Sequence, residues 1–214
     1  MSTQVEKLLS EEETEILQEI MNISFGKSAA DLADVIETHV VLSVPYIKII
    51  QITELPVYFK DNVKEYKKIS IVEQKFWGRF KGEALLVFSS GAGRELIRML
   101  QQDEGSGYES DPVEILERES LMEVGNILIG ACVGKLTEVL KDVVTYAPPM
   151  VIVEKEYAEA IAESRYDPNS TAIVLKTEFR FEEGNVSGFL FLITSQESIS
   201  WLKNALHVFM EQYE

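Results

Sequence analysis

Two short sets of polar residues could carry chemistry, because the same residue types recur at the same spacing in both halves of the chain. The sets are Glu15, Glu19 and Asn22, the first stripe, and Glu119, Glu123 and Asn126, the second stripe. An α-helix advances about 100° per residue, so steps of four and three residues return each side chain to nearly the same direction. A carboxylate pairs with cations, whereas an amide both donates and accepts hydrogen bonds. Each set is therefore predicted to present two carboxylates and one amide along one face of a helix.

The simplest alternative is a solvated helix face, since Glu is a good helix former and polar stripes are common on surface helices. That interpretation suffices for either stripe alone. A solvated face constrains residue type only loosely, however, and Asn is a mediocre helix former. The recurrence of both Glu residues and of Asn at one spacing therefore favours a functional role.

The stripes belong to a longer internal repeat with an offset of 104 positions. Pro45 recurs as Pro149, and many apolar positions match between the two halves. A later segment that begins at Gly82 recurs at Gly188, after the register has slipped by two positions. We therefore predict a single domain over 1–214, built from two repeats of about 1–102 and 111–214 that are joined by a linker at 103–110.

Helices are expected at the start and at the end of each repeat. Ser10 and Glu13 have the spacing of a capping box, and apolar residues at helical spacing follow them. Gly26 is expected to bend or break the first motif helix, and Gly130 to break the second. The expected helices cover about 11–36, 91–102, 113–141 and the residues from 195 onward.

Segments rich in β-branched and aromatic residues are expected to form strands. Pro45 lies inside one of them and predicts an edge strand or a strand start, because Pro cannot donate to a ladder. Strands that follow one another without an intervening helix indicate an antiparallel sheet. We therefore predict an α+β fold with a pseudo-twofold repeat, an antiparallel β-sheet and the motif helices packed on one face. The expected strands are 40–52, 69–77, 80–88, 144–153, 172–182 and 186–194.

The charge balance limits the partners, since 36 acidic and 20 basic residues give a formal net charge of −16. Nucleic acids and anionic membranes are bound through Lys and Arg, so this charge argues against both. The single cysteine, Cys132, cannot form an internal disulfide, which suits a reducing compartment. No apolar run is long enough to span a bilayer, and residues 1–13 lack a signal-peptide pattern. We expect an acidic cytoplasmic protein without nucleic-acid binding or membrane insertion.

Other catalytic patterns are incomplete. Gly26-Lys27-Ser28 resembles the end of a phosphate-binding loop, but Met21 stands where that loop requires a Gly. A di-metal carboxylate site would need His where both stripes have Asn. The two histidines, His39 and His207, lie far from both stripes in the sequence. We therefore predict no metal site and no cofactor-binding site in this chain.

The pattern Glu, two residues, Asn, 22 residues and Pro resembles the signature of the CheC, CheX and FliY phosphatases of bacterial and archaeal chemotaxis. The family pattern usually begins with Asp or Ser four residues before this Glu, whereas this chain has Glu15 and Glu119 there. Two motif copies resemble the CheC arrangement more than the single-site CheX arrangement. The resemblance covers essentially the whole chain. The two copies of the pattern are Glu19, Asn22 and Pro45, and Glu123, Asn126 and Pro149.

The resemblance implies a phosphatase, and so a hydrolase, that acts on phosphorylated CheY, a response-regulator receiver domain with an aspartyl phosphate and its own Mg²⁺. Hydrolysis of that phosphate needs a water held in line with the phosphorus. Asn22 and Asn126 would orient the water, because an amide can do so without acting as a base. Glu19 and Glu123 would pair with the active-site lysine of the receiver. The supporting motif residues are Glu15, Pro45, Glu119 and Pro149, and Mg²⁺ is expected to come with the receiver.

A rival function from a different class is a non-catalytic binding module that sequesters a phosphorylated receiver or regulates CheD. The resemblance implies the deamidase CheD as a further candidate partner, contacted by the helix after the second motif, about 133–141. Glu at both first motif positions is the feature that most favours altered activity. Turnover at catalytic stoichiometry would separate the two functions.

Overall fold

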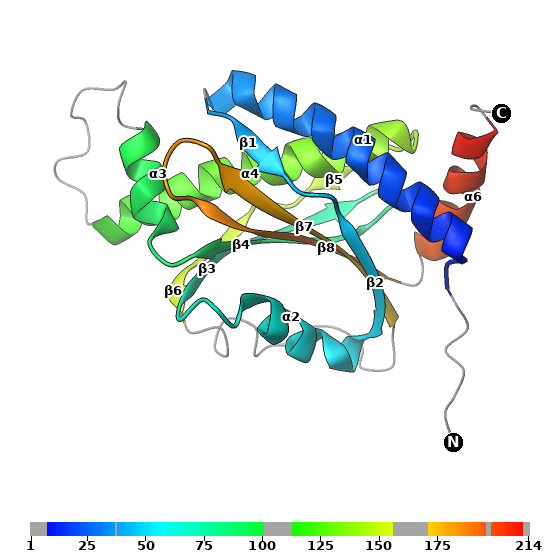
Figure 1. Ribbon diagram of the computed structural model, residues 1–214, viewed down its shortest axis with the longest axis horizontal. Helices are drawn as coiled ribbons and strands as arrows, with labels where there is room; N and C mark the ends of the chain where they lie inside the picture. The colour runs from blue at the N-terminus through cyan, green and yellow to red at the C-terminus, as the bar shows by residue number, and fades with distance from the viewer. Residues whose placement is uncertain (1–7, 37, 101–112, 156–170, 196–197, 212–214) are drawn as a thin grey trace.

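An antiparallel sheet, with eight strands among the described residues, forms the centre of the molecule in this computed structural model. Six strands follow the order β1-β7-β8-β4-β3-β5, while β2 also pairs with β7 and β6 also pairs with β3. The structure describes residues 8–36, 38–100, 113–155, 171–195 and 198–211. Figure 1 shows α1 and α4 side by side over one face of the sheet and α2 beneath the other face. The predicted α+β class, the antiparallel sheet and the motif helices on one face are confirmed. In chain order the elements are α1 Glu11–Ile36, β1 Val40–Leu42, β2 Tyr46–Gln51, the 3₁₀ helix η1 Ile52–Glu54, α2 Leu55–Val63, β3 Ile69–Trp77, β4 Gly82–Ser89, α3 Ala92–Leu100, α4 Val113–Val139, β5 Thr145–Tyr146, β6 Met150–Lys155, β7 Thr171–Phe181, β8 Ser187–Ser195 and α6 Ile199–Met210.

The two motif helices, α1 and α4, are continuous. The predicted bend or break at Gly26 and the predicted break at Gly130 are wrong, because helix runs through both positions. A glycine inside a helix costs only about 1 kcal/mol relative to Ala, which burial of the surrounding apolar residues against the sheet readily offsets. The predicted capping box is confirmed, since Ser10 N donates to Glu13 Oε2 at 2.7 Å and Glu13 N donates to Ser10 Oγ at 3.0 Å.

Each edge of the sheet is one strand interrupted at a motif proline. β1 and β2 both pair with β7, and Pro45 lies in the gap between them. β5 and β6 both pair with β3, and Pro149 lies in the corresponding gap. The expected edge strand at Pro45 is confirmed. A proline has no N–H for the ladder, so an edge strand tolerates it at the cost of a local break in pairing.

One helix was absent from the sequence-based prediction. α2 has Pro56 in its first turn. It buries Leu55, Phe59 and Val63, which are spaced four residues apart. These side chains pack on the sheet face away from α1 and α4, in a smaller core with residues such as Phe191. The short length of this helix, next to a β-rich segment, explains why periodicity alone missed it.

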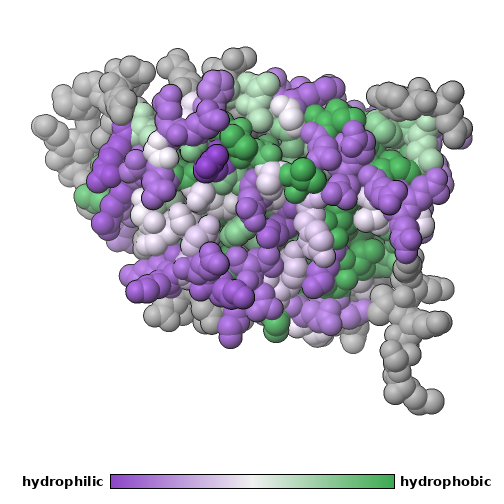
Figure 2. All heavy atoms as spheres, viewed as in Figure 1, coloured by the Kyte–Doolittle hydropathy of each residue, from purple (hydrophilic) through white to green (hydrophobic). Residues whose placement is uncertain are grey.

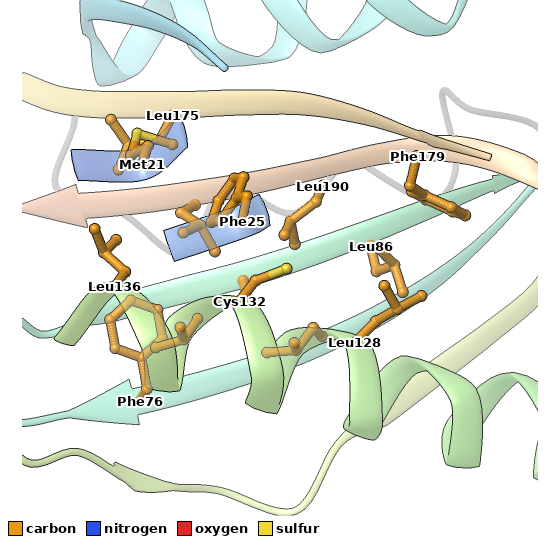
Figure 3. Close-up of a cluster of buried hydrophobic side chains, with 14 of the residues drawn as sticks. Met21, Phe25, Phe76, Leu86, Leu128, Cys132, Leu136, Leu175, Phe179 and Leu190 are labelled. Carbon is orange, nitrogen blue, oxygen red and sulfur yellow. The ribbon is translucent and has the colours of Figure 1, made fainter. Parts of the chain in front are cut away.

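The larger core lies between the sheet and the pair α1 and α4. Figure 3 shows Met21 and Phe25 of α1 and Cys132 of α4 pointing toward side chains of the sheet, including Leu175. Burying a side chain of this size stabilises the fold by roughly 1.5–3 kcal/mol, so this core holds both motif helices firmly. The predicted linker at 103–110 lies outside the described residues, and the division into two repeats stays a prediction.

Candidate functional site

The helices that carry the two stripes pack against each other and run in opposite directions (Figure 1). Near the middle of the contact, Ser28 Oγ donates to Ala131 O at 3.0 Å. Lys135 Nζ lies 3.1 Å from Asp31 Oδ2, and these two residues correspond to each other by the 104-residue offset. The stripes lie in the N-terminal halves of the two helices, so they are at opposite ends of the pair. The molecule thus offers two separate surfaces rather than one composite site.

Both stripes lie on the outer side of their helices, as the spacing predicts. Their four Glu side chains are exposed, Asn126 is exposed and Asn22 is partly exposed. The neighbouring residues Leu17, Ile20, Leu121 and Val124 are buried against the core. Each stripe is therefore fixed in direction by an apolar face that the sheet covers. Figure 2 shows polar and apolar side chains mixed over the face of the molecule that faces the viewer.

The second stripe is tied to the sheet by Gln74 of β3. Gln74 Nε2 donates to Asn126 Oδ1 at 2.9 Å and to the backbone oxygen of Ala147 at 3.0 Å. Gln74 is only 3% exposed, and its neighbours on the same face of β3, Val72 and Phe76, belong to the larger core. Asn126 is thus an exposed amide held from below by a buried one.

The first stripe has a shorter residue at the corresponding place. Met150 pairs with Glu73 and Tyr46 pairs with Lys176, so the strand register makes Thr177 of β7 the counterpart of Gln74. Thr177 Oγ1 donates to the backbone oxygen of Ser43 at 2.7 Å, just as Gln74 donates to that of Ala147. No hydrogen bond to the Asn22 side chain is found among the described residues. The hydrogen bond to the edge-strand backbone is therefore present beneath both stripes, whereas the hydrogen bond to the motif Asn is present only beneath the second.

The residue before each Asn also differs between the stripes. Gly125 lies so close to β3 that an added Cβ would be 2.8 Å from both Cγ atoms of Val72. The corresponding residue of α1, Met21, is fully buried and belongs to the same core cluster as Leu175 of β7 (Figure 3). The backbone of α4 therefore approaches the sheet closely at the second stripe, whereas a long side chain fills the space beneath the first.

A shallow groove borders each stripe on the side of the edge strand. The groove beside the second stripe has a volume of about 380 Å³, and Arg118 Nη1 donates across it to Val151 O at 2.6 Å. The groove beside the first stripe has a volume of about 510 Å³. Their lining residues are Glu73, Arg118, Met122, Pro149, Met150, Val151 and Ile152 for the second stripe, and Leu9, Ser10, Glu11, Thr14, Glu15, Ile47, Lys48 and Ile49 for the first.

The two motif prolines differ in their position relative to the grooves. Pro149 lines the groove beside the second stripe, whereas Pro45 is buried. Both interrupt the edge strand, so their shared effect is on the backbone rather than on a reacting atom. Of the supporting residues, Glu15 lines a groove directly, and Glu119 is exposed one helical turn before Glu123. A partner could therefore contact both carboxylates of a stripe at once.

Competing chemistry finds no support in the described residues. Within that part of the chain, no three His, Cys, Asp or Glu side chains are grouped so as to hold a metal ion. Cys132 is fully buried, and burial raises the pKa of its thiol to about 12, so it is not a nucleophile. Ser28 is buried inside α1 and donates to backbone oxygens, so the Gly-Lys-Ser run is part of a helix and not a phosphate loop. Among the described residues, no helix combines the length and the apolarity that crossing a membrane would need.

Gln74 was missed by the sequence-based prediction, which did not include it among the candidate site residues. A usable signal was present, because Gln74 is a polar residue at an inward position of β3, between the inward apolar residues Val72 and Phe76. A buried amide costs free energy unless it is hydrogen-bonded, by roughly 1–3 kcal/mol for each unpaired group. Gln74 Oε1 is buried and has no partner among the described residues. Such a residue is better explained by its contact with Asn126 than by core stability.

Known proteins resemble the chain in sequence and in fold. CheY-P phosphatase CheC of Bacillus subtilis (strain 168) is 25% identical over 133 residues, which are 62% of this chain and 62% of CheC. FliY of Thermotoga maritima superposes with a TM-score of 0.70 at 18% identity, covering 93% of this chain and 98% of that chain. The middle domain of FliM from H. pylori gives a TM-score of 0.56 at 12% identity, covering 92% and 99%.

No family model matches the chain. The aligned part spans less than two thirds of the length of CheC. At these identities the solved structures establish the fold, which is shared by FliY and FliM. The sequence similarity to CheC, the shared fold and the doubled Glu-x-x-Asn pattern together support the placement of this chain in the CheC/CheX/FliY family.

Proposed function

We propose that this protein is a phosphatase that hydrolyses the aspartyl phosphate of a CheY-type receiver domain. The observation that carries the proposal is the outward-facing Glu-x-x-Asn stripe, present on two helices that pack against the sheet and, in the second case, with its amide held by Gln74. The similarity to a CheY-P phosphatase supports the same reaction class. The stripe side chains are exposed or partly exposed on the outer side of their helices, so the reacting phosphate must come on a partner that covers the stripe.

The amide of the stripe has the chemistry needed for the attacking water. A water must be held in line with the phosphorus, and positioning supplies most of the rate enhancement in such transfers. Asn126 has two N–H donors that face outward, and its Oδ1 keeps one lone pair besides the one that accepts from Gln74. It can therefore fix a water by donating and accepting, without removing its proton. Asn22 would play the same role in the first stripe.

The carboxylates supply docking rather than proton transfer. Glu19 and Glu123 lie one turn before the Asn, at the distance that lets one partner contact both residues. A charge-assisted pair with a lysine beside the aspartyl phosphate would set the register of the complex. Glu15 and Glu119 add a second carboxylate to each stripe. Because the partner brings this lysine and its own Mg²⁺, the negative net charge of the chain is compatible with a phosphorylated substrate.

The rival function is a binding module that holds the phosphorylated receiver or regulates CheD without turnover. The shared fold of a FliM middle domain keeps this alternative open, because a fold does not decide between catalysis and binding. CheD contact through 133–141 also stays a proposal. Within that segment Val133, Leu136, Thr137 and Leu140 are buried, whereas Glu138 and Lys141 are exposed.

The two functions differ in stoichiometry. We would follow phosphate release from a Mg²⁺-loaded, phosphorylated CheY-type receiver with this protein at about a tenth of the receiver concentration. Release faster than the spontaneous decay of the receiver, with several turnovers per chain, is expected. Decay that is slowed and saturates at one or two receivers per chain would contradict the phosphatase and favour the binding module.

A further inference from the structure

Gln74 can make its two hydrogen bonds in only one orientation. The backbone oxygen of Ala147 cannot donate, so the amide nitrogen of Gln74 must face it. The same nitrogen then donates to Asn126, which fixes the oxygen of Asn126 toward the sheet. Since an amide group is planar, the NH₂ of Asn126 must point outward, away from Gln74.

Without such a contact, an exposed Asn side chain is not fixed. The terminal torsion of Asn has a broad and roughly twofold preference, so its oxygen and nitrogen exchange places easily. A freely turning amide presents the correct atom to a water for only part of the time. Ordering the amide before the substrate arrives removes this entropic cost from the reaction.

The first stripe provides an internal comparison. Thr177 keeps the contact with the edge strand through Ser43, but its side chain is two atoms shorter than that of Gln74. Among the described residues, no side chain replaces the missing donor to Asn22. The two stripes therefore have the same motif residues but a different support beneath the amide.

We propose that Gln74 is a positioning residue that orients Asn126, and that the second stripe therefore turns over faster than the first. The inference rests on the proposed phosphatase activity and adds a residue outside the motif. One hydrogen bond of this kind corresponds to a rate difference of up to about tenfold. The effect belongs in kcat, because Gln74 is buried beneath Asn126 and does not touch the partner.

The test isolates each stripe in turn. In a chain with Asn22→Ala, only the second stripe acts, and Gln74→Met should lower kcat by up to about tenfold with little change in KM. The same substitution in a chain with Asn126→Ala reports general damage, because only the first stripe acts there. A loss at least severalfold greater in the first background is expected. Equal losses in both backgrounds, or no loss in either, would overturn the proposal.

A reciprocal variant and a spectroscopic readout complete the test. Thr177→Gln should raise kcat in the chain with Asn126→Ala, because the longer side chain supplies Asn22 with the donor that Gln74 gives to Asn126. By NMR, the side-chain amide of Asn126 should be well ordered in the wild type and lose that order in Gln74→Met. If the wild type releases no phosphate, the proposed function fails, and this NMR comparison still decides whether Gln74 orients Asn126. An Asn126 amide that is equally ordered in both proteins would overturn the inference.

Discussion

The two stripes have identical motif residues but different contacts beneath them. Asn126 is held by Gln74 and stands on a helix that approaches the sheet closely at Gly125. Asn22 lacks a corresponding donor among the described residues, and Met21 fills the space beneath it. The comparison shows that a surface motif sets which groups are presented, whereas residues of the sheet set how firmly they are held.

The starts of the two motif helices are anchored by contacts with different helices. Glu13 and Glu117 correspond by the 104-residue offset, and both are buried. Glu13 Oε2 lies 3.4 Å from Lys203 Nζ of α6, whereas Glu117 Oε1 accepts from Arg94 Nε of α3 at 2.6 Å. Each motif helix is thus anchored to a different short helix, which places its stripe relative to the sheet.

The largest expected effect comes from removal of both amides. Asn22→Ala together with Asn126→Ala should lower phosphate release by more than about 100-fold, because water positioning is lost at both stripes. Receiver binding should stay within about threefold of the wild type, since the Glu residues remain. Both quantities are measured with a phosphorylated receiver, and Asn204→Ala, an exposed Asn of α6, is the matched control. Normal release by the double variant would contradict the role of the amides.

A smaller effect is expected from neutralisation of the docking carboxylates. Glu19→Gln with Glu123→Gln should weaken receiver binding by roughly tenfold, the value of one charge-assisted hydrogen bond. The loss should shrink at high salt, because exposed charges are screened. Titration calorimetry at two salt concentrations measures it, and Glu211→Gln at the end of α6 is the control. Unchanged affinity in the variant would assign docking to other groups.

The close approach of α4 to β3 at Gly125 can be tested by measuring the free energy of unfolding. Gly125→Ala should lower the free energy of unfolding by about 1–3 kcal/mol, because the new Cβ would overlap Val72. Gly130→Ala in the same helix meets no atom within 4 Å and should be neutral or stabilising by up to about 1 kcal/mol. Denaturant unfolding of both variants gives the comparison. Similar values for the two would show that α4 can move away from β3 at little cost.

The smallest expected effect concerns the anchor of α1. Burial raises the pKa of Glu13, but the Ser10 amide hydrogen bond, Lys203 and His207 together outweigh it and leave the pKa below its ordinary value. A lowered folded-state pKa means that this contribution to stability is present above the unfolded pKa and is lost as the pH falls through the folded value.

We therefore expect Glu13→Gln to cost about 1 kcal/mol near neutral pH, a typical value for loss of a helix cap. The difference from the wild type should narrow in the acidic range below the ordinary Glu pKa. Unfolding curves over a pH series measure this, with Glu12→Gln, an exposed neighbour, as the control. A constant difference at every pH would mean that the charge of Glu13 does not contribute.

The sequence was informative where a pattern repeats and weak where a contact is tertiary. Helix spacing placed both stripes on outward faces, and Pro45 identified an edge strand, because these features depend on local geometry. The breaks predicted at Gly26 and Gly130 were wrong, since burial against the sheet outweighs local helix propensity. Gln74 was missed because its role depends on α4 lying over β3, a contact between residues 52 positions apart.

The most direct measurement compares the two single variants, Asn22→Ala and Asn126→Ala, in phosphate release from a Mg²⁺-loaded, phosphorylated CheY-type receiver. Each chain is used at about a tenth of the receiver concentration, so that only turnover produces a signal. We predict that both variants release phosphate faster than spontaneous decay and that Asn22→Ala, which keeps the second stripe, is severalfold faster. No acceleration even by the wild type would contradict the claim that the stripes are catalytic. Equal rates for the two variants would contradict the claim that the contact with Gln74 makes the second stripe faster.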